Sequence, residues 1–252
     1  MHILAEIFWL PKAGNSLEEY EDAYWPERQL DRDVQRFSFA VADGATETSF
    51  SGLWAKMLVR AYCKGHLGVK KLPQFLPRLR HTWFKELSTK SLPWYAEEKL
   101  RSGAFSSLLG LTVEAPRNGS RAARWQAVAI GDSCLFQVRG GDLITAFPLT
   151  HSGQFNSRPI LLSSNSDSSN HSVENLIHAE GVWETEDAFY LMTDALACWF
   201  FETVERGEKP WKILRGLETS DQVAPFSVWI TELRNTKAIR NDDVTLFRIN
   251  VL

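Results

Sequence analysis

The sequence has few cysteines, almost no net charge and no long apolar run. Cys63, Cys134 and Cys198 are odd in number and far apart, so they predict neither a disulfide framework nor a zinc site, and free thiols indicate a reducing cytoplasm. Lysine and arginine number 28 against 31 acidic residues, and a net charge of −3 gives no sign of a basic surface for nucleic acid or a membrane. No stretch approaches the roughly 18 apolar residues of a spanning helix. We therefore expect a cytoplasmic protein with no nucleic-acid or membrane partner.

Size and composition are those of a folded globular protein. Hydrophobic residues make up 44% of the 252 positions and charged residues 23%, which excludes global disorder. A chain of this length buries enough apolar surface to fold without a disulfide or a structural metal. The run from Met1 to Leu10 contains Glu6 and lacks a basic start, so it predicts a strand and not a signal peptide. With no linker or repeat in view, we expect one domain over residues 1–252.

Strand and helix signals alternate in the N-terminal third. Residues 3–10 and 37–42 are apolar runs bounded by proline, glycine or aspartate, as is typical of buried strands. From residue 51 onward apolar side chains recur at three- and four-residue spacing, which predicts an amphipathic helix. We expect two further helices at about 72–87 and 94–101.

The middle of the chain reads as β structure. Short runs rich in strand-forming residues are separated by Gly, Asp, Asn and Pro, and they cover residues 105–113, 125–130, 135–139 and 143–147. Their connections are too short for crossover helices, so we expect an antiparallel meander. Residues 151–172 show no periodicity and predict a long loop, either a functional lid or a flexible segment.

The C-terminal third repeats the mixture of strands and helices. Residues 173–182, 188–192 and 244–251 predict strands, while 195–206 and 220–233 predict helices. The whole pattern is that of an α+β protein with antiparallel sheet in the middle and helices packed outside.

Familiar catalytic motifs are absent, but acidic residues stand at the ends of strand-like runs. There is no phosphate-binding glycine loop, dinucleotide fingerprint, paired-histidine zinc motif or nucleophile elbow. Asp43 and Asp194 each directly follow a run that should be buried, where a lone charge is costly unless it is paired or bound to a cation. Glu21-Asp22 and Asp242-Asp243 are further acidic pairs. Aspartate also simply begins many turns. If the acids converge, they suit Mg²⁺ or Mn²⁺.

Five motifs in order resemble those of the type 2C family of metal-dependent Ser/Thr protein phosphatases. They are Glu21-Asp22-Ala23, Val41-Ala42-Asp43-Gly44, Gly103-Ala104-Phe105-Ser106-Ser107, Ile130-Gly131-Asp132-Ser133, and Leu191-Met192-Thr193-Asp194 followed by Asp242-Asp243-Val244-Thr245. Each is weak by itself, whereas five in order over nearly the whole chain, with the expected carboxylates, are strong.

The resemblance implies a four-layer α-β-β-α sandwich of two antiparallel sheets flanked by helices. It also implies two Mn²⁺ or Mg²⁺ ions, and a weak third ion, at one edge of the paired sheets. The implied metal-binding residues are Glu21, Asp22, Asp43, Gly44, Asp132, Asp194 and Asp242. By the same resemblance, Asp43 would bridge the ions and, with Asp194, act catalytically through metal-bound water. Asp22 would orient that water, and Asp132 would contribute to the third ion.

The implied activity is hydrolysis of phosphoserine and phosphothreonine in a phosphoprotein, with a separate Ser/Thr kinase as the natural partner. One departure concerns the phosphate: the arginine that the family usually places four residues before the Glu-Asp pair is Leu17 here. Lys12, or an arginine of the 151–172 loop such as Arg158, is the candidate substitute. A second departure is Asp243 in place of asparagine, an extra carboxylate that affects metal preference. The alternative is a catalytically weak or inactive phosphatase-like module that binds a phosphoprotein or a regulatory partner.

Overall fold

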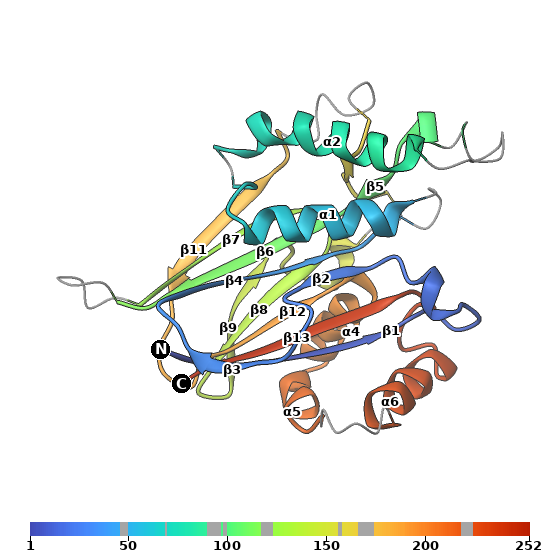
Figure 1. Cartoon of the computed structure of the whole chain (residues 1–252). Coiled ribbons are helices and arrows are strands. Elements are labelled where there is room, and N and C mark those ends of the chain that lie inside the picture. The colour runs from blue at the N-terminus through green and yellow to red at the C-terminus, as the bar shows by residue number, and fades with distance from the viewer. Residues whose placement is uncertain are drawn as a thin grey trace.

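Two antiparallel sheets lie face to face at the centre of the molecule (Figure 1). The computed structural model describes residues 1–45, 50–68, 70–89, 97, 100–116, 123–155, 158–165, 174–217 and 224–252. The six-stranded sheet has the order β3 (Leu30–Asp33), β1 (His2–Leu10), β13 (Val244–Val251), β12 (Ala188–Met192), β8 (Cys134–Arg139) and β9 (Asp142–Phe147). The five-stranded sheet has the order β11 (Ile177–Val182), β7 (Arg124–Ile130), β6 (Leu108–Glu114), β4 (Arg36–Ala42) and β2 (Ala23–Trp25).

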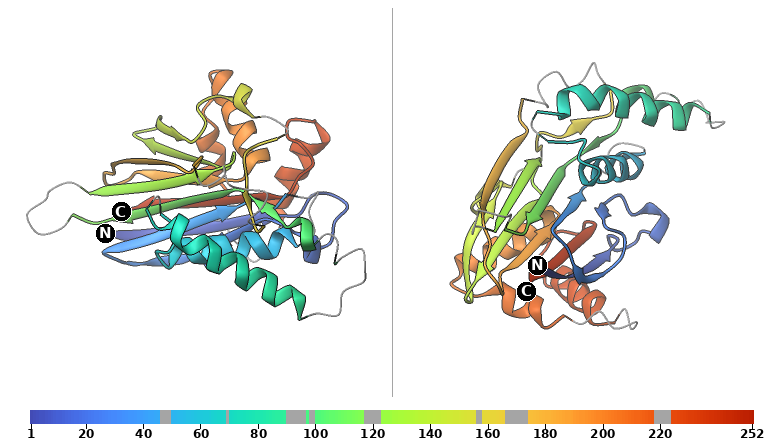
Figure 2. Two further views of the ribbon diagram at one scale, coloured as in Figure 1. Left: turned by 90° about the horizontal axis from the view of Figure 1, so that it is seen from above. Right: turned by 60° about the vertical axis from the view of Figure 1, so that its left-hand side comes forward.

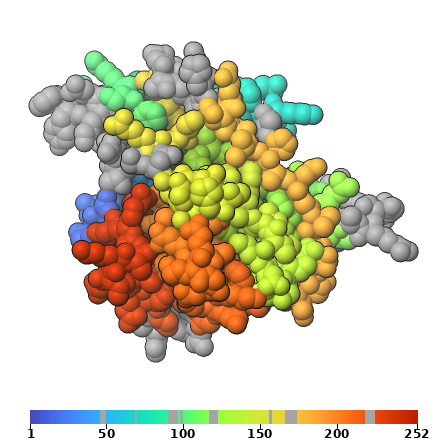
Figure 3. All heavy atoms as spheres, turned by 180° about the vertical axis from the view of Figure 1, so that it is seen from behind, coloured from blue at the N-terminus to red at the C-terminus, as the bar shows by residue number. Residues whose placement is uncertain are grey.

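Helices cover the outer face of each sheet. On the five-stranded sheet lie α1 (Ser51–Cys63) and α2 (Leu72–Ser88), and beyond the six-stranded sheet lie α4 (Asp194–Glu205), α5 (Pro210–Arg215) and α6 (Ala224–Asn235), as Figures 1 and 2 show. Viewed from behind, the orange and red atoms of these C-terminal helices form one continuous covering beside the yellow-green β8–β9 segment (Figure 3). The predicted α+β fold, a four-layer α-β-β-α sandwich, is confirmed.

Three apolar cores separate these four layers, because the central strands are apolar on both faces. In β12, Phe189 and Leu191 point into the core between the sheets, whereas Tyr190 and Met192 point into the core beneath the C-terminal helices. This period of two follows from the pleat of a β-strand. The third core, between the five-stranded sheet and α1 and α2, contains Trp54. Because both faces of these central strands are buried, the strand ends, at the edge of the sandwich, are where polar side chains can be placed.

The middle of the chain is not a single meander, contrary to the prediction. The hairpin of β6 and β7 belongs to the five-stranded sheet, and the hairpin of β8 and β9 belongs to the six-stranded sheet. The chain passes from one sheet to the other within the three residues between Ile130 and Cys134. Ser107 also interrupts the predicted 105–113 strand, which leaves the two-residue strand β5 (Phe105–Ser106) before β6.

Within the predicted loop at 151–172, residues 151–155 and 158–165 are described. Ser152–Gln154 forms a short 3-10 turn, and β10 (Leu162–Ser163) pairs with β5, so this part is more ordered than a plain loop. The rest of that prediction, most of the 94–101 helix, residue 173 and residues 220–223 lie outside the described residues. Three further elements, β2, β3 and α5, were not predicted because they are only three, four and six residues long. That residues 1–252 form one domain stays a prediction.

Across the described ranges, no helix combines the length and the apolar composition needed to cross a bilayer.

Candidate metal centre

Strand register brings the acidic residues to one edge of the sandwich. Because β12 and β13 are antiparallel, with Met192 opposite Leu246, the end of β12 lies beside the start of β13, and this places Asp194 next to Asp242. In the other sheet Ala42 lies opposite Ala23, so the residues just outside this pair, Asp43 and Asp22, are neighbours. Neither neighbourhood follows from sequence spacing, because each joins segments far apart along the chain.

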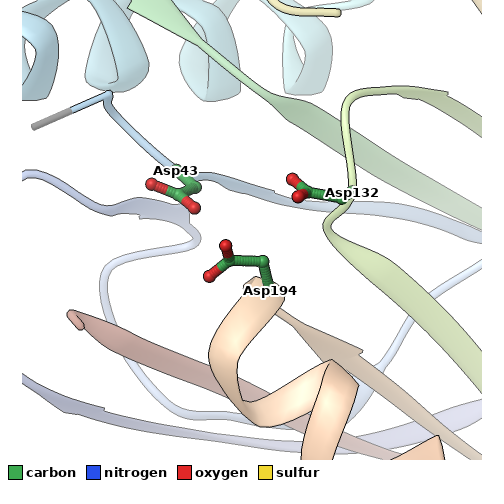
Figure 4. Close-up of side chains that lie close together, drawn as sticks. All are labelled: Asp43, Asp132 and Asp194. Carbon is green, nitrogen blue, oxygen red and sulfur yellow. The ribbon is translucent and has the colours of Figure 1, made fainter. Parts of the chain in front are cut away.

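Three aspartates point toward one another across the gap between the sheets (Figure 4). Asp43 follows β4, Asp132 lies in the link where the chain changes sheets, and Asp194 is the first residue of α4. One carboxylate oxygen of each lies within 4.8 Å of the others. Asp132 is 6% exposed and Asp194 7% exposed, whereas Asp43 is partly exposed, so a cation can reach the cluster from the side of Asp43. Three hard oxygen donors from three separate elements can surround a single cation.

The environment of these carboxyls opposes their ionisation. Burial raises the pKa of Asp43 well above its ordinary value, and repulsion from Asp22, Asp132 and Asp242 raises it further, while Arg240 opposes the effect. Burial also raises the pKa of Asp132 to about 6. For Asp22, burial together with repulsion by Asp243 and Asp242 outweighs the hydrogen bond from Thr245, so its pKa is well above the ordinary value. Such a cluster is stable in its ionised form only beside compensating positive charge.

Two of the buried carboxylate oxygens lack a hydrogen-bond partner among the described residues. Asp22, which is 1% exposed, accepts a hydrogen bond from Thr245 on Oδ2 at 2.7 Å, but its Oδ1 is unpartnered, and so is Oδ1 of Asp194. Buried polar atoms are nearly always satisfied, and each exception calls for an explanation. A divalent cation would satisfy both the charge and the orphan oxygens, so these residues fit a metal centre.

Glu21 and Gly44 lie next to each other at the start of α1. The Ser51 hydroxyl donates a hydrogen bond to the Glu21 carboxylate, and a Cβ at position 44 would stand 2.7 Å from the Glu21 carbonyl oxygen. Only glycine therefore allows the β4 end to approach Glu21 this closely. The structure thus brings Glu21 and Gly44 together, whereas the group of carboxylates within 4.8 Å of one another contains Asp43, Asp132 and Asp194 but not Glu21, Asp22 or Asp242.

Arg240 is a site residue that the sequence reasoning did not identify. Its Nη2 forms an ion pair with Asp194 Oδ2 and lies 3.7 Å from Asp242 Oδ2. Asp242, which is partly buried, also accepts a hydrogen bond on Oδ1 from the Asp243 backbone N–H at 3.0 Å. A basic residue two positions before a candidate ligand was the available signal.

Asp243 has a different contact pattern from the one expected of an extra ligand. Its Oδ1 accepts a hydrogen bond from the Lys12 backbone N–H at 2.8 Å, and its Oδ2 accepts one from the Glu21 backbone N–H at 2.7 Å. The carboxylate thus ties the 12–21 segment to the start of β13 and fixes the backbone of Glu21. This contact also brings Lys12 to the rim of the site, where its role as a phosphate ligand stays a prediction.

The position expected for the phosphate arginine is open to solvent. Leu17 begins a short 3-10 turn and is 65% exposed, on the wall of a cavity of about 540 Å³ that Asp22 also lines. An aliphatic side chain offers no donor to a phosphate there. Arg158, the other candidate, is exposed.

Comparisons with known proteins agree with this architecture. Residues 21–236 match the family profile described as protein phosphatase 2C. Among solved structures, the Mycobacterium tuberculosis serine/threonine phosphatase PstP/Ppp is 14% identical, with a TM-score of 0.61 over 100% of this chain and 99% of that one. PppA of Pseudomonas aeruginosa, a regulatory component of a type VI secretion system, is 16% identical, with a TM-score of 0.57 over 100% and 99%. The catalytic domain of PstP in complex with two manganese ions is 15% identical, with a TM-score of 0.55 over 99% of each chain. No curated protein sequence matches the chain.

Proposed function

Because the chain belongs to the protein phosphatase 2C family, we propose that it is a metal-dependent phosphatase that hydrolyses phosphoserine and phosphothreonine in proteins. The observation that carries the proposal is the cluster of Asp43, Asp132 and Asp194, in which one carboxylate oxygen of each lies within 4.8 Å of the others. The manganese complex of the similar PstP domain supports Mn²⁺ or Mg²⁺ as the ion. A phosphoprotein is the proposed substrate and a separate Ser/Thr kinase the proposed partner.

The chain's own residues supply the ligands and hold them in place. We propose that Asp43, Asp194 and Asp242, together with Glu21 and the carbonyl of Gly44, hold two ions, that Asp22 orients water, and that Asp132 contributes to a weak third ion. Two divalent ions lower the pKa of a bound water and stabilise phosphoryl oxygens during in-line attack.

Supporting residues determine the orientation of these ligands. Ser51 orients the Glu21 carboxylate, Thr245 orients Asp22 at 2.7 Å, and Tyr20 is hydrogen-bonded to Thr245 in turn. Ligand orientation of this kind supports metal affinity, and removing such a partner typically costs on the order of tenfold to a hundredfold.

The proposal is tested by hydrolysis of a phosphothreonine peptide and an aryl phosphate after treatment with EDTA. Turnover should require added Mn²⁺ or Mg²⁺, and Asp43→Asn should abolish it. Asp142→Asn is the matched control, because Asp142 is 74% exposed and pairs with Lys209 at the surface. A wild-type protein without turnover across several divalent metals and both substrates would refute the proposal.

The alternative is a weakly active or inactive module that binds a phosphoprotein or regulatory partner. The observation that favours it is the exposed leucine at position 17, where the family usually has an arginine for the phosphate. Calorimetry separates the two functions: Mn²⁺ binding without turnover supports the module, and Mn²⁺ binding with turnover supports the enzyme.

A further inference from the structure

The side chain of Arg240 enters the mouth of the carboxylate cluster from solvent. It is 54% exposed, yet its guanidinium is paired with Asp194, whose side chain is 10% exposed, and it also lies near Asp242. It also exerts an attractive potential at Asp43 and Asp132. One permanently charged group therefore reaches the carboxylates proposed to hold the ions while it remains accessible from solvent.

The backbone under Arg240 is held firmly. Ile239, its neighbour, is 7% exposed and packs into the core beneath the C-terminal helices. The Arg234 guanidinium, on α6, donates a hydrogen bond to the Asp242 carbonyl at 2.6 Å, and the Asp242 N–H donates one to the Arg240 carbonyl at 3.1 Å. Arg240 can therefore change its partner by side-chain rotation alone, without leaving the rim of the site.

The site requires a cationic donor for an incoming phosphate. A phosphate monoester brings negative charge toward a cluster of carboxylates, so the ions must be supplemented by donors that recognise phosphoryl oxygens. Leu17 supplies none. A guanidinium binds a carboxylate and a phosphate with the same planar, bidentate geometry, so a group that pairs with Asp194 is suited to phosphate as well.

We propose that Arg240 is the residue that binds the substrate phosphate, with Asp194 as its resting partner. Divalent ions that bind Asp194 displace the guanidinium, which then becomes available to phosphoryl oxygens at the same rim. The inference rests on the proposed function, because the phosphate is that of the substrate. It adds a phosphate ligand from the C-terminal part of the chain, in a loop whose Asn241 accepts a hydrogen bond from the Ala13 backbone N–H of the segment in which the family usually supplies one.

The test compares Arg240→Ala, Arg240→Lys and a matched control, Arg206→Ala. Arg206 has the same side-chain exposure, 54%, and an ion pair with Glu208, but it lies just beyond the far end of α4 from Asp194. Calorimetry measures the Kd of inorganic phosphate for the Mn²⁺-loaded protein and the Kd of Mn²⁺ itself, and steady-state kinetics with an aryl phosphate give KM and kcat.

Arg240→Ala should raise the phosphate Kd and the KM roughly tenfold or more, the usual cost of a charge-assisted hydrogen bond, with a smaller change in kcat. Mn²⁺ should bind Arg240→Ala more tightly than wild type, because the competing cation is gone. Arg240→Lys should be intermediate for phosphate, and Arg206→Ala should match wild type in every measurement.

An unchanged phosphate Kd and KM in Arg240→Ala would overturn the inference, and so would a wild-type protein that binds Mn²⁺ but no phosphate. If Arg240→Ala does not fold by circular dichroism, the Arg240→Lys values decide. Failure of the proposed function gives a different result: phosphate binding that depends on Arg240, without hydrolysis, refutes the enzyme and keeps Arg240 as the phosphate ligand.

Discussion

The two ends of β12 both carry a buried aspartate, but only one of the two is satisfied by the protein. Asp187, before the strand, is fully buried and accepts hydrogen bonds from Arg139, from Gln137 at 2.7 Å and from the Glu184 backbone N–H at 2.9 Å. Asp194, after the strand, is 7% exposed and has the Arg240 ion pair on one oxygen and nothing on the other among the described residues. The two positions are separated by roughly 20 Å.

This contrast separates a structural charge from a functional one. Burial raises the pKa of Asp187, but hydrogen bonds from Arg139, Glu184 and Gln137 outweigh it, so the net pKa is lowered. At the other end burial and mutual repulsion raise the pKa of Asp43, Asp22 and Asp132. A carboxylate that the fold has already neutralised has no need of a ligand, whereas a cluster left uncompensated is suited to the cations of the proposed function.

The largest expected effect is on catalysis. Asp194→Asn should reduce metal-dependent hydrolysis about 1,000-fold, because the loss of a metal ligand removes several kcal/mol of transition-state stabilisation. Asp187→Asn, at the other end of the same strand, should leave kcat and KM of the folded protein within about twofold. The measurement is kcat/KM for an aryl phosphate with saturating Mn²⁺. Equal losses of kcat/KM in both variants would show that Asp194 has no greater catalytic role than Asp187.

The free energy of unfolding should show the opposite order, with a larger loss in Asp187→Asn than in Asp194→Asn. Asp187→Asn places a neutral amide at a fully buried position and removes one partner of the Arg139 guanidinium, which is 27% exposed and keeps Glu184, and this should lower the unfolding free energy by about 3 kcal/mol. Asp194→Asn should cost less than about 1 kcal/mol in EDTA, because a weak, partly exposed ion pair is exchanged for relief of repulsion. Urea titration of both variants checks this, and a smaller loss in Asp187→Asn would show that the pair is not structural.

The sequence was sufficient for the fold class and for naming Asp43, Asp132 and Asp194, the three carboxylates that the structure brings together, because both are local or ordered signals. Apolar runs predicted most strands, and the motifs around Asp43 and Asp194 marked the strand ends. The sequence was insufficient for features that depend on contacts between segments far apart in the chain. The switch of sheets at Gly131–Ser133 and the bracing role of Asp243 involve partners far away in the chain. Arg240 was missed because the only signal in the sequence, a basic residue two positions before Asp242, is weak without the contact with Asp194, which lies far away in the chain.

Stabilisation by Mn²⁺ should also distinguish Asp194 from Asp187, at the two ends of β12. Mn²⁺ at a hundred times its Kd should raise the unfolding free energy of wild type by about 2.7 kcal/mol per site, because it binds the folded chain preferentially. Asp187→Asn should keep this increment on its lower baseline, and Asp194→Asn should lose most of it. Thermal unfolding with and without Mn²⁺ provides the comparison. An increment that persists in Asp194→Asn would exclude this aspartate as a ligand.

The smallest expected effect is on the pH dependence of the unfolding free energy in EDTA, and its sign differs between Asp132, in the acidic cluster, and Asp187. A raised carboxyl pKa means that the folded chain binds more protons than the unfolded one. For Asp132, with a pKa of about 6 against the usual 3.8, stability should fall as the pH rises from about 4 to 6, by on the order of 2 kcal/mol. For Asp187, whose pKa is lowered, the unfolded chain binds more protons in acid, so stability should fall as the pH drops below 3.8.

These two contributions therefore have opposite slopes on either side of about pH 4. Urea titrations on both sides of this pH should show the slope between pH 4 and 6 reduced in Asp132→Asn and the acid limb reduced in Asp187→Asn. Saturating Mn²⁺ should reverse the first slope, because ions compete with protons for the carboxylates, and should leave the second unchanged. A slope between pH 4 and 6 that Asp132→Asn leaves intact would mean that another buried group titrates there.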